Sequence, residues 1–497
     1  MPTAPLQQRR GRGPRARLAA GGALLALATV GALSPGAPAA GDRVEPLRTA
    51  RGQLVQADEL RQAARLADTS VSELRDLLVD DPTVRLHENG RVAFADFESS
   101  NATASGEVTR RTSDASWATT QARAAAKRSA VALSSRPSSP RTLYLDFDGE
   151  EVCNTEWNDN GLPCGTYAGY DTDGSPGFSA GEQKAIREAW ARVAEDYAPF
   201  NINVTTVRPP ASDLSRTSNA DQRYGVHAVV TSSVAARNAT CGGPGCAGVA
   251  LLGVFPRTDA NHARIIWAFS PEVNNSPRQV ADVVSHEAGH TLGLEHQGTA
   301  GGLLGFGAVE YYAGHGIWAP LMGSSLNHLT QWSASEYNNP SRNQDDIALI
   351  TSNGAPLVRD DHPNGVRGVE RLRRKVASSG VISTRADRDV FKIVTTCRAK
   401  LRVSVTPAAN GPNLDAALSL RRAGRTKTTT KNPGSPSSGA ATGLSASISG
   451  TYGIRGKATW YVTVDGVGAR DPLTTGYSDY GSLGAYAVRA TGRCVKG

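Results

Sequence analysis

The sequence predicts a central α+β domain built on a mixed sheet, an all-β C-terminal domain and a small N-terminal folded unit. Two changes in hydrophobic pattern carry this prediction. Between residues 142 and 350, strand-like apolar runs alternate with helices of period 3.6, which is typical of a sheet covered by helices. Beyond residue 380, short strands follow one another between Gly, Ser, Asn and Pro, as in a β-sandwich. A length of 497 residues accommodates two or three domains.

Residues 1–39 have the features of an export signal. A basic stretch ends at Arg17, an apolar run covers Leu18 to Leu33, and Ala37 and Ala39 place small residues before a cleavage site. The apolar run is shorter than the roughly 20 residues that span a bilayer, so a signal peptide is favoured over a retained membrane anchor. We therefore expect a secreted, extracellular protein that does not bind membranes.

The formal charge of +8 comes largely from this leader. Five of the 54 Lys and Arg lie in it and none of the 46 Asp and Glu, so the processed chain carries 49 basic against 46 acidic residues, a net charge of +3. So small and scattered an excess is not the basic stripe of a nucleic-acid-binding protein. We expect no nucleic-acid partner, and the oligomeric state stays open.

Residues 40–98 form the predicted pro-domain. Apolar residues recur at helical spacing from Ala57 to Val79, and Asp81-Pro82 ends that helix. Alternating residues from Val84 to Phe97 predict two strands around the turn Glu88-Asn89-Gly90. These elements are sufficient for a small folded unit.

Two linkers separate the predicted domains. Residues 99–140 are rich in Ser, Ala and Arg, lose apolar periodicity and contain the basic pairs Arg110-Arg111 and Lys127-Arg128. They predict a flexible linker open to proteolysis, which suits removal of a pro-segment. Residues 355–379 are polar and contain Pro and Gly, and they predict a second linker.

Residues 141–354 form the predicted central domain. A buried strand is expected at Thr142 to Phe147, and the capping-box pair Ser179 and Glu182 starts a helix. A second helix is expected to begin at Ser276-Pro277, because proline at a first helical position sacrifices no hydrogen bond. Further strands are expected at 203–207, 226–230 and 265–269.

Residues 380–497 form the predicted sandwich. Its strands are bounded by turn residues, and a polar loop from Thr426 to Gly443 interrupts them. The expected strands are 390–394, 401–405, 416–420, 460–464 and 486–488.

The segment from His286 to His296 carries the chemistry. On a helix, His286 and His290 lie one turn apart on one face, so both imidazoles can reach one metal ion. Glu287 is placed to deprotonate a metal-bound water as general base and to return the proton as general acid. Gly293 permits the positive φ that ends the helix and brings His296 back as a third ligand. Three nitrogen ligands leave one position open for water, which is typical of catalytic Zn²⁺.

The spacing of these residues, His-Glu-x-x-His-x-x-Gly-x-x-His, resembles the metzincin clan of zinc peptidases. Metzincins share a two-lobed catalytic domain, with the site helix above a mixed sheet and a tight methionine-bearing turn below the metal. Met322 is the one methionine besides Met1, and it lies in the turn-like run Trp318-Ala319-Pro320-Leu321-Met322-Gly323. The resemblance covers roughly residues 142–350. It implies that Met322 forms this Met-turn and that the chain is a zinc-dependent endopeptidase acting on proteins or peptides.

The segment after the third histidine also resembles secreted bacterial metzincin peptidases, in Tyr311-Tyr312 and Gly314-His315-Gly316. Some metzincins place a zinc-binding tyrosine two residues after the methionine, where this chain has Ser324. Tyr311, Tyr312 and His315 are the candidates for that role, although each is also compatible with an ordinary pocket or loop residue.

The cysteine that silences some metzincin pro-domains is missing, because no Cys precedes Cys153. If the pro-domain silences the site, a carboxylate or a histidine has to reach the metal instead. Asp96 and His87 are the candidates, and a solvated surface position is the alternative for both.

Six cysteines in an exported chain predict disulfides. A cysteine metal site is disfavoured, because no Cys-x-x-Cys occurs. Sequence alone permits many pairings. Closeness along the chain favours Cys153–Cys164 and Cys241–Cys246, which leaves Cys397–Cys494.

Residues 380–494 resemble the pre-peptidase C-terminal domain of secreted bacterial peptidases, in Asp389-Val390-Phe391 and Tyr461-Val462-Thr463-Val464-Asp465. The resemblance implies a role in export or substrate binding, and a structural spacer is the alternative. Asp171-x-Asp173-Gly174 matches part of a Ca²⁺ loop, but the bidentate Glu is absent, so a solvated turn is favoured.

Two other functions are compatible with the metal motif. A zinc-stabilised adhesin would keep the fold without catalysis, but such a site has no need of Glu287. A zinc hydrolase acting on something other than protein is the second alternative. Some of these enzymes take a third ligand from a later helix, whereas His296 lies close to the first two histidines.

Overall fold

The computed structural model describes residues 47, 49, 53–97, 130–301, 308–326, 328–432 and 443–497. The predicted signal peptide and the two basic pairs of the first linker lie outside these residues and stay predictions. Within these ranges, no helix is long and apolar enough to cross a membrane.

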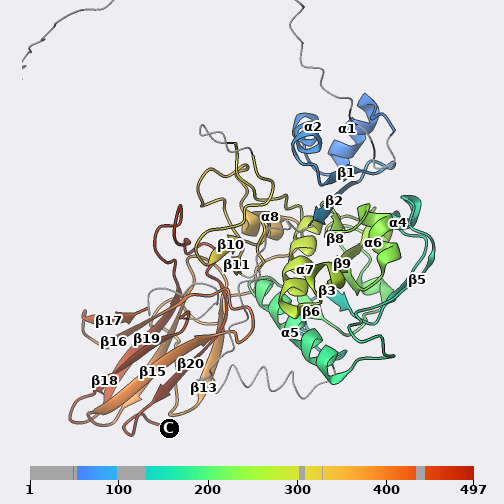
Figure 1. Cartoon of the computed structure of the whole chain (residues 1–497). Coiled ribbons are helices and arrows are strands. Elements are labelled where there is room, and N and C mark those ends of the chain that lie inside the picture. Colours follow the sequence, from blue (N-terminus) through green and yellow to red (C-terminus); the bar gives the residue numbers. More distant parts are fainter. Residues whose placement is uncertain are drawn as a thin grey trace, which may run out of the picture. The chain divides into compact units, whose positions relative to one another are not determined.

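A seven-stranded mixed sheet carries the candidate site (Figure 1). Its order is β1-β2-β8-β9-β7-β3-β6, and β6, β3, β7 and β9 run parallel to their neighbours in that group. β8, β2 and β1 are added antiparallel on the other side. The bounds are β1 Val84–Leu86, β2 Val92–Phe97, β3 Arg141–Asp146, β6 Asn203–Thr205, β7 Tyr224–Thr231, β8 Cys246–Leu251 and β9 Ile265–Phe269.

Two long helices share one hydrophobic core with one face of this sheet. α5 (Ala180–Asp196) begins with the expected capping box, and α7 (Pro277–Thr291) begins with the expected proline. Ile186 of α5 and Val284 of α7 belong to the same buried cluster as alternate residues of the strands. This shared core therefore holds α7, the helix that carries His286 and His290, against the sheet.

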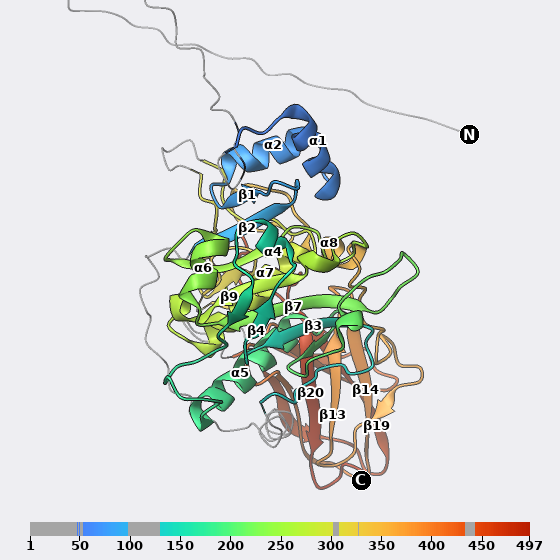
Figure 2. The same cartoon turned by 90° about the vertical axis from the view of Figure 1, so that its right-hand side faces the viewer.

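Shorter elements cover the opposite face of the sheet. Trp157 lies in a second buried cluster together with Trp267 of β9, and its indole N–H donates to the Ile265 carbonyl over 2.9 Å. Figure 2 shows α4 and β4 in front of the central strands. The elements are β4 Glu150–Val152, α4 Glu156–Asp159, β5 Gly165–Tyr167 and α6 Val234–Cys241.

The predicted pro-domain contains two helices, so the single helix expected from Ala57 to Val79 is wrong. α1 (Ala57–Leu66) ends, and α2 (Val71–Asp80) begins with Ser70 as its N-cap. The Ser70 side chain accepts from the Glu73 N–H while the Glu73 side chain accepts from the Ser70 N–H, which favours a new helix start at this point. Both helices pack on β1 and β2, which belong to the main sheet.

The sequence from 308 to 358 returns beneath the site helix before the chain enters the sandwich. It contains β10 (Trp318–Pro320), which pairs in parallel with β11 (Leu329–Gln331), and then α8 (Asp346–Ser352). Leu321 and Met322, directly after β10, join the core shared by α5 and α7.

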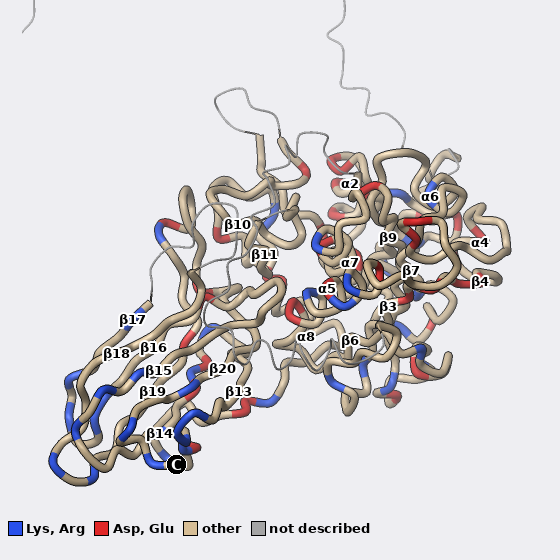
Figure 3. Tube along the Cα trace, turned by 60° about the horizontal axis from the view of Figure 1, so that its bottom comes forward, with Lys and Arg blue, Asp and Glu red and all other residues tan. Residues whose placement is uncertain are grey.

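Two sheets enclose the C-terminal core, with orders β12-β14-β19-β16-β17 and β13-β20-β15-β18. Two of these strands, β12 and β13, begin inside the predicted linker 355–379. Val369 and Leu372, on either side of β12, are buried in that polar stretch. Figure 3 shows Lys and Arg on several of the sandwich strands and charges of both signs over the rest of the described chain. The bounds are β12 Glu370–Arg371, β13 Ala377–Ile382, β14 Arg388–Thr395, β15 Ala399–Pro407, β16 Ala416–Arg422, β17 Thr428–Lys431, β18 Ala446–Tyr452, β19 Ala458–Gly466 and β20 Gly484–Thr491.

The three expected disulfide pairs are confirmed. Two close short loops, and the third joins the two ends of the sandwich across a sequence separation of 97. Disulfides of this kind are typical of an oxidising environment. The pairs are Cys153–Cys164, Cys241–Cys246 and Cys397–Cys494.

Candidate metal centre

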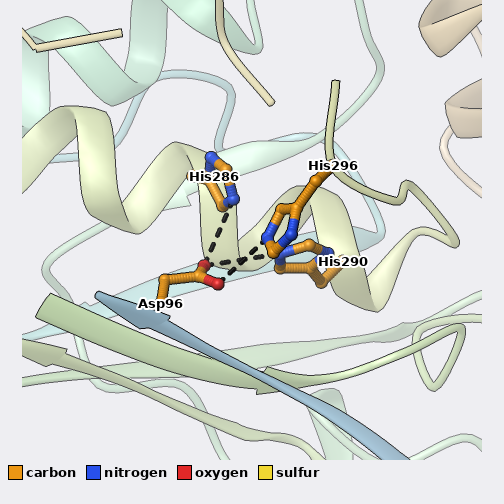
Figure 4. A group of neighbouring side chains, drawn as sticks. All are labelled: Asp96, His286, His290 and His296. Carbon is orange, nitrogen blue, oxygen red and sulfur yellow. Dashed lines mark hydrogen bonds and ion pairs between the residues drawn. The ribbon is translucent and has the colours of Figure 1, made fainter. Parts of the chain in front are cut away.

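Three buried imidazoles face one another at the end of α7 (Figure 4). His286 and His290 lie one turn apart on the helix, with ring centroids 4.8 Å apart. Gly293 has a φ of +89°, a conformation that glycine adopts without strain, and the chain turns back there. The ring of His296 consequently lies 4.9 Å from that of His290 and 5.3 Å from that of His286.

The Nδ1 atom of each ring is already engaged. Each contacts an oxygen that can only accept, so Nδ1 carries a proton. In the neutral rings of His286 and His290 this leaves a lone pair on Nε2, as a metal ligand requires. Nε2 of His296 faces the carboxylate oxygen Asp96 Oδ1 at 3.0 Å, and it would have to release a proton to bind a metal ion. The partners are Leu321 O for His286 at 2.9 Å, Leu294 O for His290 at 2.7 Å and Asp81 Oδ2 for His296 at 2.9 Å.

The three Nε2 atoms converge on the carboxylate of Asp96 from β2. Asp96 Oδ2 lies 3.2 Å from His286 Nε2 and 3.4 Å from His290 Nε2, and Oδ1 lies 3.0 Å from His296 Nε2. Within the described chain, Nε2 of His286 and of His290 are buried and make no hydrogen bond. Four-coordinate Zn²⁺ with ligands at about 2.0–2.1 Å sets its donors roughly 3.3–3.4 Å apart, so this donor set fits that ion.

Burial would lower the pKa of His296, but the Asp96 carboxylate and the hydrogen bond to Asp81 outweigh it and raise that pKa well above its usual range. Burial would raise the pKa of Asp96, but the positive charges of His296 and His286 outweigh it and hold the pKa well below its usual range. Burial lowers the pKa of His290 to about 4, so that ring is neutral at physiological pH and available to a cation.

Glu287 lies next to the first histidine and is fully buried. Burial, and then the neighbouring Asp96 carboxylate, raise the pKa of Glu287 well above its usual range. A bound cation would oppose this shift. Gly248 of β8 makes room for the side chain, because a Cβ at that position would lie 2.7 Å from Glu287 Cδ. A carboxyl so placed can exchange a proton with a group bound beside the histidines.

Met322 lies directly below the histidines and is fully buried. A Cβ added to Gly289, between the two helical histidines, would lie 2.7 Å from the Met322 sulfur. The residue before it, Leu321, accepts the hydrogen bond from His286 Nδ1. The turn at Met322 thus supports the helix and also orients one imidazole.

Of the three candidates for the missing tyrosine, only Tyr311 reaches the site. Its hydroxyl donates to Asp96 Oδ1 over 2.9 Å. The Tyr312 hydroxyl instead contacts His315 Nδ1 at 2.6 Å, and His315 Nε2 donates to the Gly476 carbonyl of the C-terminal region over 2.7 Å. Tyr312 and His315 therefore tie the central region to the sandwich.

The remaining candidates of the sequence lie elsewhere. Nδ1 of His87 lies 3.1 Å from Glu156 Oε1, so of the two latency candidates only Asp96 touches the histidines. Asp171, Asp173 and Glu182 do come together. Asp171 Oδ1, however, accepts from the backbone N–H of Asp173 over 3.0 Å, as in an ordinary turn.

A cavity opens beside Glu287, and Asp96, His286 and Tyr311 also line it. The rest of its walls combine apolar and hydroxyl side chains, in part from the residues just after Met322. The lining includes Phe97, Val283, Ser324, Ser325 and Leu326. The cavity therefore adjoins both the histidine cluster and Glu287.

Asp196, at the end of α5, joins the site helix to the sandwich. Its Oδ2 accepts from the Ser285 hydroxyl over 2.6 Å, one residue before the first histidine. Its Oδ1 accepts from the Asn413 amide over 2.8 Å. Burial raises the pKa of Asp196 to about 6, while Ser285 and Asn413 lower it. The sandwich thus contributes to the hydrogen-bond network behind the metal centre.

Sequence reasoning missed four residues that shape this site: Asp81, Gly248, Asp196 and Glu310. Asp81 was interpreted only as a helix stop. Gly248 lies in the apolar run of β8, a strand that was not expected although Ala247 to Leu252 are all apolar apart from that glycine. Asp196 and Glu310 carry no local signal, because their partners are distant in sequence.

No protein-family model and no curated protein matches this sequence. Solved structures similar to part of the chain include the pre-peptidase C-terminal domain of a collagenase from Bacillus anthracis, with 12% identity, a TM-score of 0.17, and coverage of 26% of this chain and 99% of that chain. PliG, a periplasmic inhibitor of g-type lysozyme from Aeromonas hydrophila, has 10% identity and a TM-score of 0.16, covering 25% and 96%. A Yersinia pseudotuberculosis-derived mitogen has 13% identity and a TM-score of 0.15, covering 24% and 86%. Similarities this low establish neither fold nor function.

Proposed function

We propose that this chain is a secreted zinc-dependent endopeptidase of the metzincin type. His286, His290 and His296 are the proposed metal ligands, and Glu287 is the proposed general base and acid. The observation that carries the proposal is the burial of three convergent Nε2 atoms whose Nδ1 partners are all engaged. With Nδ1 engaged, each ring turns its Nε2 towards the same point, as the ligands of one metal ion do.

Three further features support the metzincin assignment. The helix that carries the histidines packs on a mixed sheet, Gly293 turns the chain towards the third histidine, and a buried methionine lies beneath the rings. Three disulfides and the predicted signal peptide support export. For the sandwich we propose a role like that of pre-peptidase C-terminal domains, together with the support that Asp196 transmits to α7.

Zn²⁺ held by the three histidines would polarise a peptide carbonyl and lower the pKa of a water molecule. Glu287 would accept a proton from that water as the water oxygen attacks the carbonyl carbon. The same carboxyl then donates the proton to the leaving amine nitrogen, so that one water is consumed for each peptide bond broken. With substrate bound, the Tyr311 hydroxyl would donate to the substrate oxygen that takes the place of Asp96 Oδ1.

Hydrolysis of casein or gelatin by the processed protein tests this proposal. We expect cleavage that stops when a zinc chelator is added and that Glu287→Ala abolishes while zinc content is unchanged. Glu151→Ala, which removes an exposed glutamate on β4, is the matched control and should remain active. His296→Ala should weaken zinc binding.

Two results would contradict the proposal in different ways. Casein cleavage by Glu287→Ala at the parental rate would remove Glu287 from the mechanism. Failure of a zinc-loaded, processed parent to cleave any protein substrate would refute the endopeptidase assignment itself.

A further inference from the structure

We propose that residues 53–97, here called the N-terminal segment, are a built-in inhibitor of the metal centre, with Asp96 as the group that closes it. This inference rests on the proposed zinc peptidase function and concerns regulation of that same site. Among the described residues of the segment, Asp96 is the one that meets all three histidines.

The segment occupies the edge of the sheet beside the site. β2 pairs antiparallel with β8, with Phe94 opposite Ala250 and Asp96 opposite Gly248. A free strand edge is a template for an extended peptide, because its N–H and C=O groups are unpaired. With β2 in place those groups of β8 are already paired, so a substrate cannot add to this edge.

An irregularity in the ladder aims the carboxylate. The register shifts between Asp96 and Phe97, so that Phe97 pairs with Cys246 and skips Ala247. Bulges of this kind redirect a side chain and increase the local twist of a strand. Figure 4 shows Asp96 rising from β2 towards the three imidazoles on the helix and the following loop.

Asp96 occupies the position that catalysis has to leave open. Its two oxygens lie 3.0–3.4 Å from the three Nε2 atoms, and Tyr311 donates to Oδ1. Phe94 covers the same cluster, since its ring stacks on His290 at 4.1 Å with an interplanar angle of 8°. An anionic fourth donor leaves no room for water beside the histidines, so the site is silent while β2 is paired.

Most of the buried apolar side chains of the segment pack on one another. Its buried cluster consists of residues from Leu60 to Phe94 and, from the rest of the chain, of Leu252 alone. Polar contacts attach it elsewhere, such as Asp81 to His296 and Asn89 to Glu156. After hydrolysis of a bond between residues 98 and 129, non-covalent contacts alone would hold the segment: these polar contacts, the β2–β8 ladder, and the packing of Ala93 and Ala95 against the central sheet.

A second carboxylate is placed to orient His296 after the segment has left. Asp81 holds His296 Nδ1, and Asp81 would leave with the segment. Glu310 Oε1, outside the segment, lies 3.4 Å from the same Nδ1 atom. Glu310 can therefore orient the third histidine once Asp81 has gone, and release opens the metal without dismantling its ligand set.

The test uses the full-length chain loaded with Co²⁺ or Zn²⁺, in the parent and in Asp96→Asn. Co²⁺ reports its donor set in its visible absorption spectrum, independently of turnover. We expect Asp96→Asn to change that spectrum and to release Zn²⁺ to a chelator faster, by roughly tenfold or more. Asp76→Asn, which removes an exposed carboxylate from the same segment, should match the parent.

Casein hydrolysis by the same samples provides the second readout. Full-length parent should be inactive, whereas full-length Asp96→Asn and parent cut by trypsin in the linker should be active. Thermal unfolding monitored by circular dichroism establishes that Asp96→Asn is folded. If that variant is misfolded, the spectra of intact and cut parent replace the comparison, and they should differ.

The outcomes separate this inference from the proposed function. Identical Co²⁺ spectra and Zn²⁺ release rates for parent and folded Asp96→Asn would overturn the role of Asp96, even if the cut protein is an active peptidase. A changed spectrum with no hydrolysis by any sample would support Asp96 as the closing group and count against the peptidase function instead. Equal activity of intact and cut parent would overturn the inhibitor role.

Discussion

Replacing Gly248 by alanine should displace the Glu287 carboxylate, the proposed general base, without touching any of the three proposed metal ligands. A Cβ at this position of β8 would lie 2.7 Å from Glu287 Cδ and 2.8 Å from Cγ. Carbon atoms pack at about 3.5–4.0 Å, so the side chain or the strand has to move by about 1 Å. A misplacement of about 1 Å at a reacting group costs on the order of 100-fold in rate, or about 2.7 kcal/mol in activation free energy.

The assay is casein hydrolysis by processed Gly248→Ala, with kcat, KM and zinc content measured together. We expect kcat to fall by about 100-fold while zinc content stays at the parental level. Gly165→Ala is the control, because a Cβ at that glycine would meet no atom within 4 Å. A fully active Gly248→Ala with unchanged zinc and an unchanged melting temperature would refute the placement of Glu287 against β8.

Three further predictions concern other parts of the chain. Glu310→Gln should weaken Zn²⁺ binding by roughly 10- to 100-fold in the processed protein but hardly in the full-length chain, where Asp81 holds the same imidazole. Competition with a chelator measures this on both forms, and equal effects would argue against the replacement of Asp81 by Glu310. Replacing Cys397 and Cys494 by serine opens a loop with a sequence separation of 97, which should cost about 4–5 kcal/mol of unfolding free energy by chemical denaturation; a loss below 1 kcal/mol would show that the sandwich ends hold without the disulfide. Burial raises the pKa of Asp389 from 3.8 to about 8, so this carboxyl destabilises the fold increasingly as the pH rises from about 4 to about 8. Asp389→Asn should therefore raise the melting temperature more at pH 9 than at pH 5, and a pH-independent change would contradict the raised pKa.

Much of the proposed metal site could be predicted because its proposed donors are neighbours along the chain. His286 and His290 share a helix face by the period of the helix alone, and Gly293 marks the turn that brings His296 back. The start of α7 at Pro277 was equally local. These features depend on spacings of a few residues, which a sequence displays directly.

The strand beside the site was harder to predict. β8 has no alternation, because both of its faces are buried, and Gly248 interrupts its apolar run. A short apolar run of this kind carries little signal for strand over helix. Without β8 there was no partner for β2, so the predicted pro-domain was treated as a unit of its own, whereas its strands extend the central sheet.

By itself, the sequence determined the candidate set of three histidines, the neighbouring glutamate and the turn glycine, since each of the helix and turn rules acts over one or two turns of backbone. The disulfide pairs were only favoured by closeness along the chain. Only the tertiary structure decided which carboxylate faces the histidines. Asp96 and Asp81 are separated from His296 by 200 and 215 residues. Asp96 reaches it through the register of β2 on β8, and Asp81 from the end of α2, which packs on β1 and β2. Register depends on packing and backbone pairing between distant strands, which no local pattern encodes.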